Sequence, residues 1–207
     1  MTIENRKTTS LKILYLSLEA HLRGPIPKVD PILIGSLNAL GCQITKGTWG
    51  RHADNESILQ KIFGRLKDIW CAFWTLVRLR PDILYIATTL DQRALLRDIP
   101  LLIAVYLLPT KKILMEHGSN TSPLTTPGPS LYKMCTRLLI RMADAILLLS
   151  TEEMEIWKSF EPRGNYYRVD NPFVSSANFK SELLPERARE PKSKLTLLYA
   201  GRLIESK

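Results

Sequence analysis

The sequence has few cysteines and no long apolar run. Its three cysteines, Cys42, Cys71 and Cys135, show no CxxC spacing, and an odd number cannot all pair within one chain. Reduced thiols in a cytoplasmic protein are the simplest interpretation. The longest apolar run, residues 99–108, is about half of what a bilayer crossing needs. The run at 13–18 is shorter than a signal-peptide core, so we expect neither a membrane span nor a secretory leader.

Several motifs with well-defined chemistry are also absent. The sequence contains no GxGxxG, GxxxxGK[ST], HExxH or GxSxG pattern. This argues against a dinucleotide site, a P-loop, a zinc protease and a hydrolase nucleophile, respectively. The histidines at 21, 52 and 117 are scattered, so we predict no metal site, and His52, in a polar loop, is expected only to be solvated.

The balance of charge favours anionic partners. Lysine plus arginine number 29 against 20 aspartate plus glutamate, a net charge of +9, in a chain of 207 residues that is 45% hydrophobic. Phosphates, nucleic acid and acidic lipid headgroups all fit such an excess, and the excess does not choose among them. We expect no nucleic-acid binding, because the sequence has no zinc-finger spacing, RRM-like motif or basic arm.

Apolar runs of strand length alternate with segments of helical period. The pattern predicts strands at 12–17, 42–45, 83–88, 112–116, 145–149 and 166–169, and helices at 31–40, 58–79, 92–108, 131–142 and 151–160. Several strands are almost continuously apolar, so both faces of the sheet should be covered. The predicted fold class is therefore α/β, a Rossmann-like parallel sheet with helices on both faces.

The composition changes after residue 171. A polar, proline-punctuated stretch precedes a fresh apolar strand at 195–200. We therefore expect a Rossmann-like domain over 1–174, a linker over 175–193 and, over 194–207, the truncated start of a second domain.

Candidate binding residues follow the predicted strands, since ligands of open parallel sheets bind beyond the carboxyl ends of the strands. Gly24 follows the first strand, where it either opens the backbone to a ligand or forms a turn with Pro25. His117 follows the fourth strand, and its imidazole either contacts a sugar or phosphate or bonds a neighbouring carbonyl. Arg202 and Lys207 follow the last strand and either grip a diphosphate or lie in the solvent.

Seven segments follow one another in the order and spacing of a known family: KILYLS, LNALGCQIT, RPDILYIAT, KKILMEHG, RMADAILLLSTEE, VDNPFV and LLYAGRLIESK. Together they resemble the family 4 retaining glycosyltransferases of the GT-B fold, over nearly the whole chain. The resemblance implies transfer of a sugar, with retention, from a nucleotide-diphosphate donor to a glycan or lipid-linked glycan, without a cofactor or an obligatory metal. It implies further that His117 is catalytic, that Gly24 frames the substrates, and that Arg202 and Lys207 bind the donor diphosphate.

The resemblance ends a few residues into the family's second domain, so we expect these 207 residues alone to transfer no sugar. The alternative is a noncatalytic α/β binding module or a truncated gene product.

Two basic surfaces raise the question of a membrane. The helix at 58–79 carries four cations and four aromatic side chains: Lys61, Arg65, Lys67, Arg78, Phe63, Trp70, Phe73 and Trp74. Such a helix either lies on an anionic bilayer at the inner face of the membrane or packs its apolar stripe against the sheet, the commoner arrangement. A second basic ridge, Lys133, Arg137 and Arg141, is either simply solvated or suited to a lipid-linked acceptor.

Overall fold

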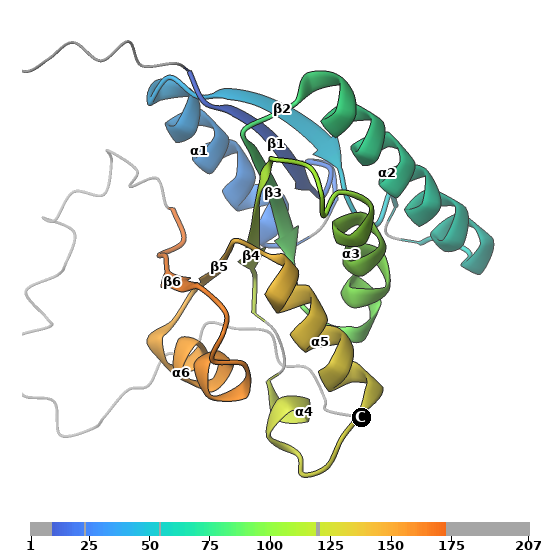
Figure 1. Ribbon diagram of the computed structural model, residues 1–207. Coiled ribbons are helices and arrows are strands. Elements are labelled where there is room, and N and C mark those ends of the chain that lie inside the picture. The colour runs from blue at the N-terminus through green and yellow to red at the C-terminus, as the bar shows by residue number, and fades with distance from the viewer. Residues whose placement is uncertain (1–9, 23, 54, 119–120, 173–207) are drawn as a thin grey trace, which may run out of the picture. The chain divides into compact units, whose positions relative to one another are not determined.

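The computed structural model describes residues 10–22, 24–53, 55–118 and 121–172. They form a six-stranded parallel sheet of order β2-β1-β3-β4-β5-β6 with helices on both faces (Figure 1), which confirms the predicted fold class. The strands are β1 (Lys12–Ser17), β2 (Gln43–Thr48), β3 (Ile83–Thr88), β4 (Lys111–Glu116), β5 (Ala145–Leu148) and β6 (Tyr166–Arg168). The helices are α1 (Ile26–Ala39), α2 (Ile58–Leu79), α3 (Gln92–Ala104), α4 (Ser122–Thr125), α5 (Leu131–Met142) and α6 (Thr151–Phe160).

The chain divides into two units, Met1–Phe173 and Val174–Lys207. The second unit lies outside the described residues, and with it the expected linker and the strand at 195–200. No helix in the described part is long and apolar enough to cross a bilayer.

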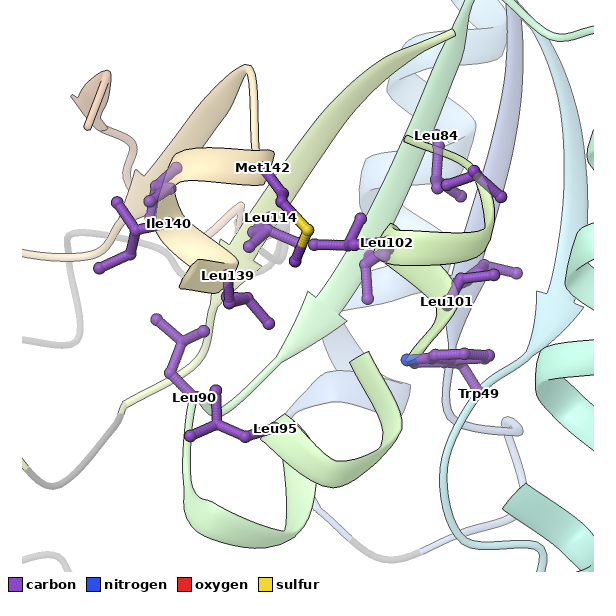
Figure 2. Close-up of a cluster of buried hydrophobic side chains, with 14 of the residues drawn as sticks. Trp49, Leu84, Leu90, Leu95, Leu101, Leu102, Leu114, Leu139, Ile140 and Met142 are labelled. Atoms are coloured by element: carbon purple, nitrogen blue, oxygen red, sulfur yellow. The ribbon is translucent and has the colours of Figure 1, made fainter. Parts of the chain in front are cut away.

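Because successive side chains of each strand point to opposite sides of the sheet, the strands contribute to two apolar clusters, one on each side. Leu14 and Leu16 face the larger cluster, to which α2, α3, α5 and α6 all contribute side chains. Figure 2 shows part of it, with Leu101 and Leu102 of α3 and Leu139 of α5 gathered near Leu84 and Leu114 of the sheet. Ile13 and Tyr15 point to the opposite side, where α1 covers them.

Three element bounds differ from the predicted ones by three residues or more; other bounds of the predicted elements shift by at most one residue, and the short helix α4 was not predicted. The first helix begins at Ile26 rather than residue 31, because Pro27 sits in the first turn, where no backbone N–H is needed. The second strand continues to Thr48 rather than stopping at 45. The third helix ends at Ala104 rather than residue 108, and the ammonium of the buried Lys112 donates hydrogen bonds to the carbonyls of Tyr106 and Leu108.

Aspartates hold the amino ends of two strands. Asp82, just before β3, accepts a hydrogen bond of 2.8 Å from the backbone N–H of Lys12 in β1. Asp144, just before β5, accepts one of 2.9 Å from Lys112 N–H in β4 and lies 2.9 Å from the Lys111 ammonium. Burial by itself raises the pKa of Asp144, but these two donors outweigh it, so its pKa lies below the ordinary value.

At the carboxyl ends of the strands, side chains cap the N-termini of the helices that follow. Ser57 and Gln60 form a reciprocal capping box at the start of α2. Asp91 accepts from Ala94 N–H at the start of α3, and Ser150 accepts from Glu153 N–H at the start of α6. These caps fix where the helix N-termini stand around the carboxyl ends of the strands.

Candidate functional site

The order of the strands creates a crevice at the carboxyl edge. The chain passes from β1 outward to β2, then returns to β3 and continues to the other side. The loops after β1 and β3 therefore diverge toward opposite faces. In open α/β sheets, ligands bind at such a switch point.

A cavity of about 430 Å³ elsewhere, between α3 and α5, is mostly apolar, whereas the switch-point crevice has a more polar lining and is smaller, about 210 Å³. Leu18 and Ile26, which flank the loop containing Gly24, form one wall of this crevice. The end of β3 and the first turn of α3 form another wall, and Gly50 and Arg51 after β2 contribute a third. The crevice is thus built from three loops that are far apart in the sequence.

Four arginines line the crevice: Arg51, Arg65, Arg93 and Arg97. Protein contacts orient two of them. Arg97 lies over the ring of Trp49, 5.0 Å from its centroid, and its Nε is 2.6 Å from Asp98 Oδ1. Arg65 donates to the carbonyl of Gly50 and pairs with Glu56 at 3.1 Å. Guanidinium groups held in this way are suited to phosphate or carboxylate oxygens.

Asp98 is the buried anchor of this wall. Its carboxylate is fully buried in α3 and accepts hydrogen bonds from Trp49 Nε1 (2.8 Å) and Thr88 Oγ1 (2.5 Å) as well as from Arg97. It therefore joins the ends of β2 and β3 to α3. Nothing in the sequence identified it, because its three partners are known only once the chain is folded.

Gly24 stands beside the crevice. Its φ of +144° is a conformation that side chains rarely adopt, and a Cβ built there would lie 3.7 Å from Arg51 Nη2. Glycine is thus required at position 24 by the backbone conformation, and not because a side chain would clash with its neighbours. Its expected contact with substrates remains a prediction.

His117 follows β4 at the same edge. Its backbone N–H donates to the carbonyl of Thr88 at 3.0 Å, and Gly118, with φ +80°, turns the chain after it. The imidazole is half-buried, and its Nε2 is buried with no hydrogen-bond partner among the described residues. Burial lowers the pKa of His117, and the opposing effect of the Asp30 carboxylate is smaller, so the neutral imidazole is favoured at physiological pH.

A second buried carboxylate, Asp30, lies near His117 and was also missed by sequence reasoning. Asp30 is fully buried in α1 and accepts hydrogen bonds from Tyr15 (2.8 Å) and Ser17 of β1, while Lys46 Nζ lies 3.6 Å away. Tyr15 stacks on Tyr85 with ring centroids 4.4 Å apart. Burial raises the pKa of both tyrosines, so their hydroxyls stay protonated. The one sequence signal was an aspartate within an otherwise apolar helix face.

The other histidines do not join His117. His52, which its polar loop suggested was only solvated, has Nε2 2.9 Å from the buried Asp68 and Nδ1 3.8 Å from Glu19. His21 Nδ1 lies 3.3 Å from Glu19. Across the described residues, no three histidine, cysteine, aspartate or glutamate side chains are grouped to hold a metal.

The structure thus brings Gly24 and His117 to one edge of the sheet. Arg202 and Lys207, the predicted diphosphate ligands, lie outside the described residues. The arginines of the crevice, Asp98 and Asp30 are additional polar residues at this edge.

Comparisons with known proteins return similar folds but no family. No protein-family model matches the sequence, and no curated protein matches it significantly. Among solved structures, the chain is similar to UGT73P12 of Glycyrrhiza uralensis, a GT-B glycosyltransferase solved with glycyrrhetinic acid 3-O-monoglucuronide. The identity is 12%, the TM-score is 0.47, and the match covers 78% of this chain and 49% of that one.

Two kinases are similar to a comparable degree. Pyridoxal kinase of Entamoeba histolytica is 13% identical, with a TM-score of 0.42 and coverage of 71% of this chain and 53% of the kinase. A phosphomethylpyrimidine kinase of Bacteroides thetaiotaomicron is 14% identical, with a TM-score of 0.43 and coverage of 81% and 65%. The chain spans between 49% and 65% of the length of these three proteins. Such likenesses concern the α/β fold alone and do not separate sugar transfer from phosphoryl transfer.

Proposed function

We propose that the chain is the acceptor-side domain of a glycosyltransferase that uses a nucleotide-diphosphate sugar and retains the anomeric configuration. The observation that carries the proposal is a neutral, half-buried imidazole, His117, at the same sheet edge as an arginine-lined crevice at the switch point. The ordered motifs that resemble family 4 glycosyltransferases supply the type of reaction.

Each group has a task in such a reaction. The unpartnered Nε2 of His117 can either donate a hydrogen bond to a hydroxyl of the transferring sugar or accept one from it, depending on the tautomer. A charged imidazolium could only donate. The arginines of the crevice suit an anionic group of the acceptor, a glycan or lipid-linked glycan. Arg202 and Lys207 would hold the donor diphosphate. Catalysis then consists of positioning and of stabilising the departing diphosphate, with no cofactor beyond the donor.

Phosphoryl transfer is less well supported by the residues. The sequence has no GxxxxGK[ST] loop to cradle nucleotide phosphates, and the first loop has Gly24 as its sole glycine between β1 and α1. Gly50 is the one glycine among the described residues that line the crevice, so the crevice has four arginines but no glycine-rich backbone cradle.

The test uses the protein encoded by the complete natural gene. A panel of nucleotide sugars is scored for binding, hydrolysis and transfer, with His117→Ala compared with His21→Ala, whose imidazole is 61% exposed. We expect turnover of one donor class, a loss of about 10²-fold in kcat for His117→Ala, and wild-type kinetics for His21→Ala. Both variants are checked for folding by circular dichroism.

Two outcomes count against the proposal in different ways. Unchanged kcat in His117→Ala would remove His117 from the mechanism while leaving the activity. No binding or turnover of any nucleotide sugar would refute the transferase itself and favour a noncatalytic module.

A further inference from the structure

Helix α2 turns its apolar side away from the sheet. Only three of its 22 residues, Asp68, Ala72 and Leu76, are buried, and they recur at every fourth position along one narrow stripe. The opposite side presents seven apolar residues, here named the α2 apolar face: Leu59, Ile62, Phe63, Leu66, Trp70, Trp74 and Val77. Phe63 is 67% exposed and Trp70 63%.

The commoner arrangement, in which the apolar stripe of α2 packs against the sheet, is therefore wrong for most of the length of this helix. Ile69 and Phe73 alone among the stripe residues pack against the described core, from the flank of the helix. The N-terminal half of α2 also extends past the strands (Figure 1), and its apolar residues Leu59, Ile62 and Phe63 are exposed. A contiguous apolar surface of this kind marks an interaction site rather than ordinary surface.

The charges around the α2 apolar face are of one sign. Lys67 and Arg78 each stand one turn beyond an aromatic residue of the face, Phe63 and Trp74 respectively. Neither cation has an ion pair within the described part of the chain. The helix has a single acidic residue, Asp68, and it is buried on the other side. The exposed surface of α2 is thus apolar, aromatic and cationic.

The basic ridge on α5 is a poorer candidate for such an interaction surface, because each of its cations is engaged by other groups of the protein. Lys133 is buried and donates to the carbonyls of Thr126 and Gly128. Arg137 lies over the ring of Phe160, and Arg141 pairs with Glu161 at 2.8 Å.

We propose that the α2 apolar face lies on the surface of an anionic phospholipid bilayer. Its aromatic and aliphatic side chains enter the boundary between headgroups and acyl chains, and Lys67 and Arg78 meet lipid phosphates at its rim. Tryptophan rings favour this depth because they are apolar with one polar N–H. A second copy of the chain is the poorer occupant, since two such faces would bring cations of like charge together.

The test measures binding of the 207-residue chain to vesicles of phosphatidylcholine, with and without phosphatidylglycerol, by sedimentation and tryptophan emission. Trp49 and Trp157 are fully buried, so a blue shift on binding reports Trp70 and Trp74. We expect binding to the anionic vesicles only, weakened by salt.

Variants localise the contact. Phe63→Gln with Trp70→Gln should weaken binding at least about tenfold, since two large apolar side chains are lost. Lys67→Gln and Arg78→Gln should each weaken it about fivefold. The matched controls are Leu107→Gln, at a side chain 92% exposed after α3, and Lys158→Gln on α6, which should both bind as the wild type does. All substituted side chains are exposed, so the fold should be retained in each.

Three results would overturn the inference: no sedimentation with anionic vesicles, equal binding to neutral ones, or equal losses in the α2 and control variants. If the first result were accompanied by dimerisation through α2, the α2 apolar face would instead bind a second copy of the chain. The assay contains no nucleotide sugar, so its outcome is independent of the proposed transferase activity.

Discussion

Asp98→Ala tests whether the buried carboxylate of α3 holds the crevice wall together. The substitution removes the acceptor of three hydrogen bonds, from Trp49 Nε1, Thr88 Oγ1 and Arg97 Nε. Trp49 is 0% exposed and Thr88 2%, so water cannot replace the lost acceptor for either donor. Arg97 is better placed to turn toward solvent.

The expected loss of stability follows from the two stranded donors. Each buried donor left unsatisfied costs roughly 1–3 kcal/mol, and removing one partner of a buried charged network costs roughly 3–5 kcal/mol. We therefore expect Asp98→Ala to lower the free energy of unfolding by about 4 kcal/mol. That is a large part of the total for an ordinary domain.

Urea denaturation followed by tryptophan fluorescence measures this loss. With a slope of about 2 kcal/mol/M, the midpoint should fall by about 2 M. Asp170→Ala is the matched control, because Asp170 is 79% exposed in a surface pair with Arg168 and should contribute less than about 1 kcal/mol. Equal midpoints for the two variants would show that Asp98 is not the anchor that its contacts indicate.

Two further substitutions probe the edges of the sheet. Gly50→Ala should lower the free energy of unfolding by about 1–3 kcal/mol, because φ at Gly50 is +116° and a Cβ there would lie 2.8 Å from Arg97 Nη1. Gly35→Ala should raise it, because nothing lies within 4 Å of a Cβ built at Gly35. The reverse order of urea midpoints would contradict this. Asp144→Asn should cost about 1 kcal/mol at pH 7. Because folding lowers the pKa of Asp144, its contribution to stability is present above the ordinary aspartate pKa of about 3.9. That contribution is lost as the pH falls through the lower pKa of the folded state. Unfolding curves of the wild type and Asp144→Asn should therefore converge near pH 2, and a constant difference at every pH would refute the role of charge.

Local patterns predicted the elements well. The bounds of β1, β3, α2, α5 and α6 coincide with those predicted, because apolar periodicity and helix caps act over a few neighbouring residues. The start of α1 was misplaced because Pro31 resembles an N-terminal proline, whereas Pro27 occupies that position and Pro31 lies inside the helix.

Features that depend on distant partners were not predictable from one sequence. The periodicity of α2 indicated a helix but not which side would be buried: Asp68, Ala72 and Leu76 are buried, whereas most of the larger apolar stripe is exposed. His52 looked solvated because its partner Asp68 is 16 residues away on the helix that follows. Asp30 binds Tyr15 and Ser17 of β1, whereas Asp98 binds Trp49, just after β2, and Thr88 of β3. Only the folded sheet brings these groups together.

The aspartates that precede β3 and β5 give the two edges of the sheet different freedom to vary. At the amino edge, Asp82 and Asp144 tie neighbouring strands together and so lock how they align. Loops at the far edge inherit that alignment without having to maintain it. Loop residues there, other than Gly24, Gly50 and the partners of Asp98, are therefore open to exchange during divergence, and a new ligand preference can arise while the strands keep their alignment.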